Sequence, residues 1–468
     1  DFNNQPRGID FSPSGLKMYV GNDHDDNIDE LMEYDLACPF NLFSGKCSEL
    51  TDDKERAGIA EAQIKLANRT IDYSTTSAFN RLKWIKRNKD KQDLTNLNMD
   101  IHFSNKVLAK LNEAVKASLN KTKVSTTING ERKKRDIFYW NELSLAVGES
   151  KETSTSLSTD IQVNSFTYGA DILTKNNSVM GVALRYGADK VEVGSSGSEL
   201  DSNTLNLTFY NSKPSENESK FFETIIGIGI METDINTSLD GKDFFANNRL
   251  GQQIYTSLKA EDHFEIEKLK LIHSVQFDYG FTKLHSYFEE VSFSRASGGL
   301  NVDDQNIHTS NLRTSLAAVH DTSNDRFIMK RHGRLEYQAA IHRSSDFKYS
   351  YNNDINTKYS TELSPGSIHN LNGEIGIDIE FKKYKLFLIY ERNQSLNYGH
   401  IDKIHFAYGF LPNKTTEYKY SFNGSENINS SFSIDKNINN LNFTFKIENE
   451  LLDPLEYNQA KVLVHSKF

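Results

Sequence analysis

The chain is poor in two residue types that constrain a fold strongly. Its 468 residues include only two cysteines, Cys38 and Cys47, and seven prolines. Two thiols cannot build a disulfide scaffold or a metal site with four thiolate ligands. They are close enough in sequence to form one local disulfide in an oxidising compartment. The few prolines, together with 21 Tyr and 29 Phe, favour β-structure.

Two further absences limit the classes of function. No apolar run approaches the ~18 residues that a membrane helix needs, and the mean hydropathy is −0.60. The 54 Lys and Arg against 64 Asp and Glu give a net charge of −10, which excludes a general basic surface for nucleic acid. A transmembrane barrel is still allowed, because its strands show apolar side chains to lipid only at alternate positions.

The first fifty residues predict a small β-unit. Gly8–Phe11 and Leu16–Val20 are short apolar stretches joined by a turn that contains Pro13 and Gly15, and Leu31–Leu36 is a third stretch. This pattern resembles one blade of a β-propeller, so we interpret residues 1–50 as the last blade of a propeller-like domain. A single blade cannot bury its faces. We therefore expect the other blades to precede residue 1 in a longer protein.

Two segments have helical periodicity. Within residues 51–88 the apolar residues Ile64, Ala67, Ile71, Ala78, Leu82 and Ile85 recur at helical spacing. The spacing predicts one amphipathic helix or a pair of helices. The simplest interpretation is a helical linker whose apolar stripe packs on a neighbour and whose cluster of basic residues around Trp84 faces solvent. A second helix is predicted for residues 104–119, where Leu108, Leu111, Val115 and Leu119 form a narrow stripe among Lys106, Lys110 and Lys116.

From Ile137 to Phe468 apolar and polar residues alternate persistently. Examples are Ile226, Ile228 and Ile230, and the run from His273 to Phe281. Up to about 16 such stretches can be marked, separated by polar connections of very unequal length. A period of two over about ten residues, with one apolar and one small or polar face, is typical of a transmembrane antiparallel β-barrel.

The order of these parts resembles the C-terminal end of autotransporters, the type V secretion proteins. The residues that carry the resemblance are Gly169-Ala170-Asp171, Asn177, Gly181-Val182-Ala183, Tyr186-Gly187, Phe277-Asp278-Tyr279, Phe288-Glu289 and the terminal Phe468. On this basis we divide the chain into a propeller-like passenger end (1–50), a helical linker (51–103), a pore helix with its connector (104–133) and an all-β autotransporter barrel (134–468).

The resemblance implies a function and several details. It implies a barrel of 12 strands in the bacterial outer membrane that exports its own N-terminal passenger and anchors it at the cell surface. The partners would be the lipid bilayer, the passenger, the barrel-assembly machinery and periplasmic chaperones. Val462, Val464 and Phe468 would form the barrel-assembly signal. The barrel would close by pairing of its first strand, near Leu143–Val147, with its last, near Val462–Phe468.

The pore helix is assigned from the same resemblance. The segment 104–119 directly precedes the barrel, its apolar stripe is too narrow for lipid, and its lysines suit a lumen with acidic side chains. We therefore predict that Lys106, Leu108, Lys110, Leu111, Val115, Lys116 and Leu119 lie inside the barrel.

Catalysis has little support in the sequence. No Gly-x-Ser-x-Gly elbow, His-Glu-x-x-His pair or glycine-rich phosphate loop occurs, so we expect no enzymatic activity, no metal and no cofactor. Two alternatives to a translocator stay open. One is a soluble secreted β-rich adhesin or binding module, and the other is a passive outer-membrane porin.

Overall fold

The computed structural model describes most of the region from residue 137 to 410 and several parts outside it. The described residues are 5–12, 17–23, 30–35, 50, 53–88, 94, 125–128, 131–134, 137–174, 176–239, 241–291, 299–324, 327–342, 344–352, 354–381, 384–410, 416–423, 429–438, 441–450 and 458–466.

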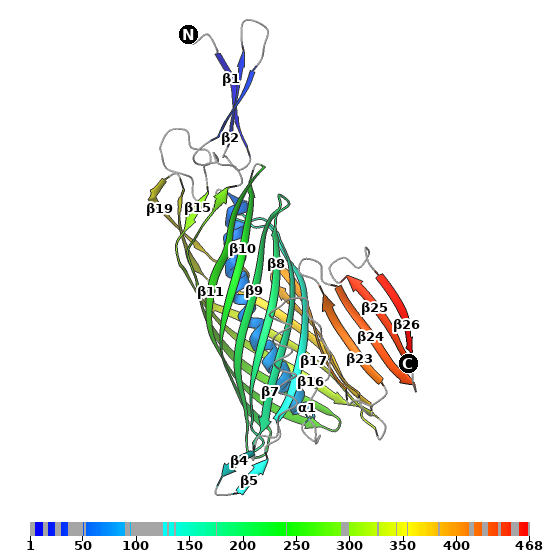
Figure 1. The fold of residues 1–468 in the computed structure, drawn as a ribbon. Helices are drawn as coiled ribbons and strands as arrows, with labels where there is room; N and C mark the ends of the chain where they lie inside the picture. Colours follow the sequence, from blue (N-terminus) through cyan, green and yellow to red (C-terminus); the bar gives the residue numbers. More distant parts are fainter. Residues whose placement is uncertain are drawn as a thin grey trace.

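Twelve long antiparallel strands form a closed barrel (Figure 1). Each pairs with its neighbours in the ring, and the ring closes where β22 pairs with β6, from Gly399 opposite Ser150 to Phe406 opposite Leu143. The strands are β6 (Ile137–Ser150), β7 (Thr159–Leu173), β8 (Val179–Val193), β9 (Ser198–Pro214), β10 (Lys220–Leu239), β11 (Lys242–Ile266), β12 (Leu269–Leu284), β16 (Gln305–Asp321), β17 (Phe327–His342), β20 (His369–Phe381), β21 (Tyr384–Ser395) and β22 (Gly399–Phe410). The resemblance to autotransporters implied a barrel of 12 strands, and this number is confirmed.

Burial alternates along the barrel strands as the sequence predicted. On β10, Ile226, Ile228 and Ile230 are exposed on the outer wall, whereas Glu223 and Ile225 of the same strand are fully buried inside. A barrel with an apolar outside and a mostly polar inside is the arrangement that lipid requires, since closure leaves no unpaired backbone edge in hydrocarbon. The outer wall is therefore the lipid-facing surface.

The closure that we expected at the C-terminus is wrong. Strand β6 pairs with β22, while β26 (Asn458–Ser466) pairs with β25 in a separate sheet ordered β23-β24-β25-β26. The other three strands of this sheet are β23 (Thr416–Asn423), β24 (Asn429–Ile438) and β25 (Leu441–Glu450). Twelve strands already satisfy both edges of the ring, so these four are not needed for closure. They account for the surplus in the count of about 16.

Connections of unequal length give the barrel two different ends. The connections 174–178, 215–219, 267–268, 322–326 and 382–383 have two to five residues, whereas 285–304 and 343–368 at the opposite end are much longer. Short turns face the periplasm and long loops face the outside in outer-membrane barrels. The end with the long loops is therefore the extracellular mouth.

The long loops fold into a small second sheet at this mouth. It is ordered β13-β15-β18-β19 and consists of β13 (Tyr287–Phe288), β15 (Leu300–Val302), β18 (Ser345–Tyr351) and β19 (Asp354–Leu363). The short strand β14 (Glu290–Val291) pairs with β11. We call the four-stranded unit the mouth sheet.

A long helix, α1 (Lys54–Asn88), runs inside the barrel from the mouth to the periplasmic end (Figure 1). Before it, β1 (Gln5–Phe11), β2 (Lys17–Asp23) and β3 (Glu30–Asp35) form the three-stranded sheet that the sequence predicted. Figure 1 places this sheet beyond the extracellular mouth and the hairpin of β4 (Ser125–Ile128) and β5 (Glu131–Lys134) beyond the periplasmic end. Among the described residues, no helix combines the length and the apolar character needed to span a bilayer.

Candidate functional site: the helix-filled lumen

The lumen of the barrel is occupied by α1. Of its 35 residues, 27 are buried, and they include polar and charged side chains on every side, such as Glu61, Gln63, Thr70, Ser77 and Arg81. A helix on a protein surface buries one stripe. Burial all round shows that α1 is enclosed by the barrel wall rather than packed on one neighbour.

The helix that we assigned to a linker is therefore the helix that fills the pore. A helix over residues 51–88 is confirmed, but its assignment to a linker with a solvated basic face is wrong. The physical reason is that the barrel wall facing α1 is polar and acidic, so a helix can bury basic residues there. The predicted pore-helix residues 104–119 lie outside the described residues, and that prediction remains untested.

Both ends of α1 are capped. At the mouth, Asp53 Oδ1 accepts hydrogen bonds from the backbone N–H groups of Glu55 (3.1 Å) and Arg56 (3.3 Å), which satisfies donors that the first helical turn leaves unpaired. At the periplasmic end, Lys330 donates from Nζ to the backbone oxygen of Arg87. A cation at this end also complements the helix dipole.

Basic residues in the periplasmic half of α1 pair with acidic residues of the wall. Arg81 forms two hydrogen bonds with Asp171 of β7 (2.7 and 2.9 Å), with both side chains only 1 % exposed. Further pairs join Lys83 to Glu374 (2.9 Å), Arg87 to Asp378 (2.6 Å), and Lys86 to Glu223 (2.8 Å) and to Glu261. These contacts reach strands β7, β10, β11 and β20, so the helix is fixed from several sides.

Nearer the extracellular mouth, α1 carries both acidic and basic side chains that pair with the barrel wall. Asp72 of α1 accepts hydrogen bonds from Arg313 of β16 (2.7 Å) and Lys403 of β22 (3.0 Å). One turn earlier, Arg69 pairs with Asp189 of β8 (3.1 Å). The order of charges along α1 thus matches the order on the wall, which sets both the rotation of the helix and its depth.

The helix also contacts both strands at the closing seam. Ser77 donates to Glu142 of β6 (2.7 Å), while Asp72 binds Lys403 of β22. Across the seam itself, His405 Nδ1 lies 3.3 Å from Glu142. The helix therefore joins the two strands on which closure depends.

Some of the residues that carried the resemblance, Gly169, Asp171 and Gly181, line the wall near Arg81. Gly169 and Gly181 face inward, where an added Cβ would meet the rings of Trp140 and Tyr210 at 2.1 and 2.3 Å. Tyr210 in turn accepts a hydrogen bond from Trp140 (2.7 Å) and donates to Asp171 (2.9 Å). The glycines make room for two rings that orient the carboxylate bound by Arg81.

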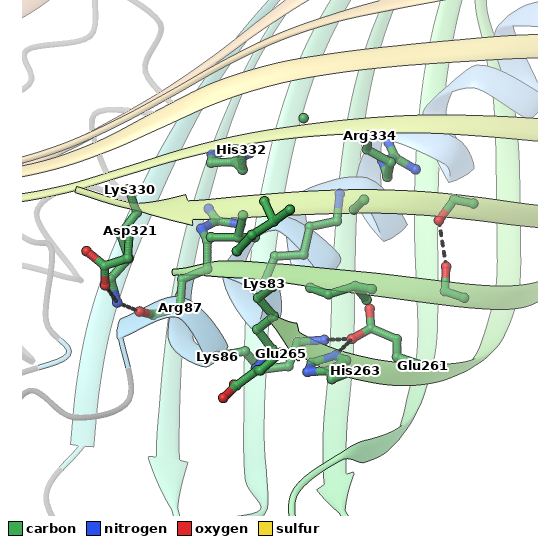
Figure 2. A pocket seen from close by; sticks show the side chains of 18 of the residues that line it. Lys83, Lys86, Arg87, Glu261, His263, Glu265, Asp321, Lys330, His332 and Arg334 are labelled. Atoms are coloured by element: carbon green, nitrogen blue, oxygen red, sulfur yellow. Dashed lines mark hydrogen bonds and ion pairs between the residues drawn. The ribbon is translucent and has the colours of Figure 1, made fainter. Parts of the chain in front are cut away.

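A cavity of about 500 Å³ lies at the periplasmic end of the lumen, beside the last turn of α1. Figure 2 shows Lys83, Lys86 and Arg87 of the helix pointing toward this space together with His332 and Arg334 of β17, and Lys86 beside Glu261 and His263. Most of these cations already have carboxylate partners. The cavity is thus a polar vestibule below a filled lumen.

The mouth sheet seals the other end. Its core combines Phe347, Tyr349 and Tyr351 with Ala57 and Ala60 from the first turns of α1. Arg56 lies over the rings of Phe244 (5.1 Å) and Tyr351 (5.6 Å). Glu289 is buried nearby and accepts a hydrogen bond from the backbone N–H of Leu300 (2.9 Å). Burial raises the pKa of the Glu289 carboxyl to about 7, and the charge of Arg56 offsets only part of this shift.

The remaining predicted site residues are only partly described. Val462 and Val464 lie on β26, whose sheet does not include the barrel strands. Phe468, Cys38 and Cys47 lie outside the described residues. Their roles as an assembly signal and a local disulfide stay predictions.

The fold defines the class of this barrel, and a comparison with known families gives its family. The class is that of closed 12-stranded outer-membrane barrels with a helix before the first strand. The autotransporter beta-domain family matches residues 140–391, which is 252 of 468 residues, and the chain belongs to this family. It is a protein of the bacterial outer membrane.

Several solved structures are similar in fold. The translocator domain of the autotransporter NalP from Neisseria meningitidis is 14 % identical, with 65 % of this chain and 95 % of that chain covered and a TM-score of 0.45. The beta domain of the Bordetella autotransporter BrkA is 13 % identical over 58 % of this chain and 98 % of that chain, with a TM-score of 0.42. The transport unit of AIDA-I from Escherichia coli is 10 % identical over 64 % and 97 %, with a TM-score of 0.36. No curated protein sequence matches the chain.

Because these ion pairs are buried, a single substitution in the lumen should lower the stability of the barrel strongly. Arg81→Gln leaves Asp171 buried without its cation, so the free energy of unfolding in detergent should fall by about 3–5 kcal/mol. Lys54→Gln is the matched control, because the Lys54–Glu152 pair at the mouth is 43 % and 55 % exposed and should contribute less than about 1 kcal/mol. Urea titration followed by tryptophan fluorescence measures both. Equal effects of the two substitutions would contradict the placement of α1.

The buried carboxyl of Glu289 should make the stability of the mouth sheet depend on pH. The folded carboxyl holds its proton more tightly than the unfolded one, whose pKa is near 4.5. Its contribution is therefore complete below pH 4.5 and decreases as the pH rises through 7. Glu289→Gln keeps the group neutral, so the variant should match the wild type near pH 5 and melt at a higher temperature near pH 8. The exposed neighbour Glu290→Gln is the control, and a Glu289→Gln variant that melts lower than wild type at pH 8 would refute this assignment.

Proposed function

We propose that the barrel exports the N-terminal part of its own chain and then anchors it at the cell surface. The observation that carries this proposal is the path of α1. The helix begins at the extracellular mouth, beyond which β1–β3 lie, and ends at the periplasmic side, where the first barrel strand also starts. Export of the segment before α1 through the lumen of its own barrel would leave the chain on this path.

The polar lumen supports this function physically. Polar and charged inward side chains such as Glu142, Asp171 and Glu374 can replace water around a passing polypeptide, so the backbone need not enter hydrocarbon. Once export is complete, the ion pairs of α1 fill the same lumen and leave the passenger tethered. A passive porin needs an open lumen, and a soluble module would not expose a belt of apolar side chains.

The proposal needs no catalytic residue in this chain. Folding of the passenger outside and binding of α1 inside the barrel both favour the exported state. We infer further that the barrel-assembly machinery and periplasmic chaperones act on the chain before insertion, because twelve strands with unpaired edges and an apolar outer face would aggregate in water.

Cysteine labelling of intact cells tests the proposed path. In the full chain with Cys38→Ser and Cys47→Ser, a membrane-impermeant maleimide should label Glu33→Cys of β3 and Lys358→Cys of β19 on intact cells. Asn217→Cys, in the turn between β9 and β10, should react only after the outer membrane is permeabilised.

The three positions distinguish an error in the proposed export path from an error in the orientation of the barrel. Labelling of Lys358→Cys but not of Glu33→Cys would leave the barrel orientation intact and contradict export. Labelling of Asn217→Cys on intact cells, with Lys358→Cys protected, would contradict the orientation itself.

A further inference from the structure

Three exposed histidines form a row on the outer wall of the barrel. His308 of β16, His342 of β17 and His369 of β20 lie on successive strands of the ring. In the register of the sheet, His308 lies opposite Phe281 of β12, and His369 lies opposite Ala339 of β17. All three lie near the extracellular ends of their strands. We call them the outer histidine row.

Tyrosines hold two members of the row. The hydroxyl of Tyr279 is 3.1 Å from Nδ1 of His308, and the hydroxyl of Tyr337 is 2.6 Å from Nδ1 of His369, with these two rings stacked at 5.8 Å. His342 packs edge-on against His308 at 6.1 Å. Within the described part of the chain, Nε2 of His308 and of His369 has no hydrogen-bond partner. Each imidazole is therefore oriented through one nitrogen and can bind a ligand through the other.

The row lies near the upper limit of the apolar belt. On β12, Val275, Phe277 and Tyr279 are exposed below it, and on β20, Leu371 and Ile375 are exposed below it. The next outward side chain above Phe281 is Lys283, which pairs with Asp304 (2.9 Å). A level between exposed apolar side chains and charged ones is the level of the lipid headgroups. At the extracellular end this is the outer leaflet.

We propose that the outer histidine row binds the phosphate groups of lipids in the outer leaflet. When a tyrosine hydroxyl donates to Nδ1, the neutral imidazole carries its proton on Nε2 and can donate it to a phosphate oxygen. Imidazole is also the side chain that ordinarily gains a charge between pH 8 and pH 5, so acidification strengthens the interaction. The titratable groups that face the row are Tyr279, Tyr337 and the neighbouring imidazoles, and Lys283 above them is neutralised by Asp304.

An aromatic belt alone does not explain this arrangement. Tyrosine and tryptophan already suit the interface between lipid and water without histidine neighbours. Adjacent imidazoles add nothing to that role unless a phosphate or a charge is to be bound. The same barrel offers a comparison at its other end. His273 of β12 and His320 of β16 are exposed on the outer wall near the periplasmic turns, and no described aromatic ring packs against either.

Lipid binding by the purified full chain tests the proposal. The protein in a neutral detergent is titrated with phosphatidylglycerol or with phosphatidylcholine at about pH 5.5 and about pH 8, and binding is followed by native mass spectrometry and by the melting temperature. Three chains are compared: wild type, the variant His308→Gln/His342→Gln/His369→Gln, and the control variant His273→Gln/His320→Gln.

The wild type and the control variant should bind phosphatidylglycerol more tightly at the lower pH, by roughly fivefold for each imidazole that becomes charged, with a smaller change for phosphatidylcholine. The triple variant should lose this pH dependence while it keeps the melting temperature of the wild type in detergent alone. The proposal is overturned if the triple variant keeps the dependence, if the control variant loses it, or if inorganic phosphate produces the same change as the lipid.

Discussion

The structure depends on the match between the charges of α1 and those of the lumen. A polar barrel interior suits the export that we propose, yet it leaves acidic side chains such as Asp171, Glu223 and Asp378 buried once water is displaced. Burying a lone carboxylate costs several kcal/mol, so each of these groups needs a cation. The helix supplies Arg81, Lys86 and Arg87 at the right depths. In the function that we propose, the filling of the lumen and the anchoring of the passenger are therefore a single electrostatic step.

The same requirement explains why closure and plugging are linked. A ring of twelve strands removes every free edge from lipid only if β6 and β22 stay paired. The helix contacts both strands, through Ser77 on one side and Asp72 on the other. The mouth sheet then covers the first turns of the helix with an apolar core, so the extracellular opening is closed by apolar packing and the deeper lumen by charge.

Much of the fold was accessible from the sequence because lipid imposes a strict period. The alternation along Ile226–Ile230 and His273–Phe281 predicted which side chains face outward, and both runs do so. The helix over residues 51–88 and the small sheet before it were also predicted correctly. The assignment of residues 51–88 to a linker followed a rule for soluble proteins, in which basic residues such as Lys83 and Arg87 face water. That rule fails inside an acidic lumen, where a helix with polar residues on every side is the one that fits.

Closure could not be derived from pattern alone, since strands β23–β26 alternate as the barrel strands do, and only the pairing of Phe406 with Leu143 shows where the ring ends. The most direct test of the account concerns the position of α1. Ser77 and Thr167 of β7 are both buried, and their hydroxyls are 3.3 Å apart in the middle of the lumen. In a background without Cys38 and Cys47, the variant Ser77→Cys/Thr167→Cys should form an intramolecular disulfide in outer membranes, seen as a mobility change on a non-reducing gel that neither single variant shows. A correctly inserted barrel whose two thiols stay separately reactive to a small permeant maleimide under oxidising conditions would contradict the central claim.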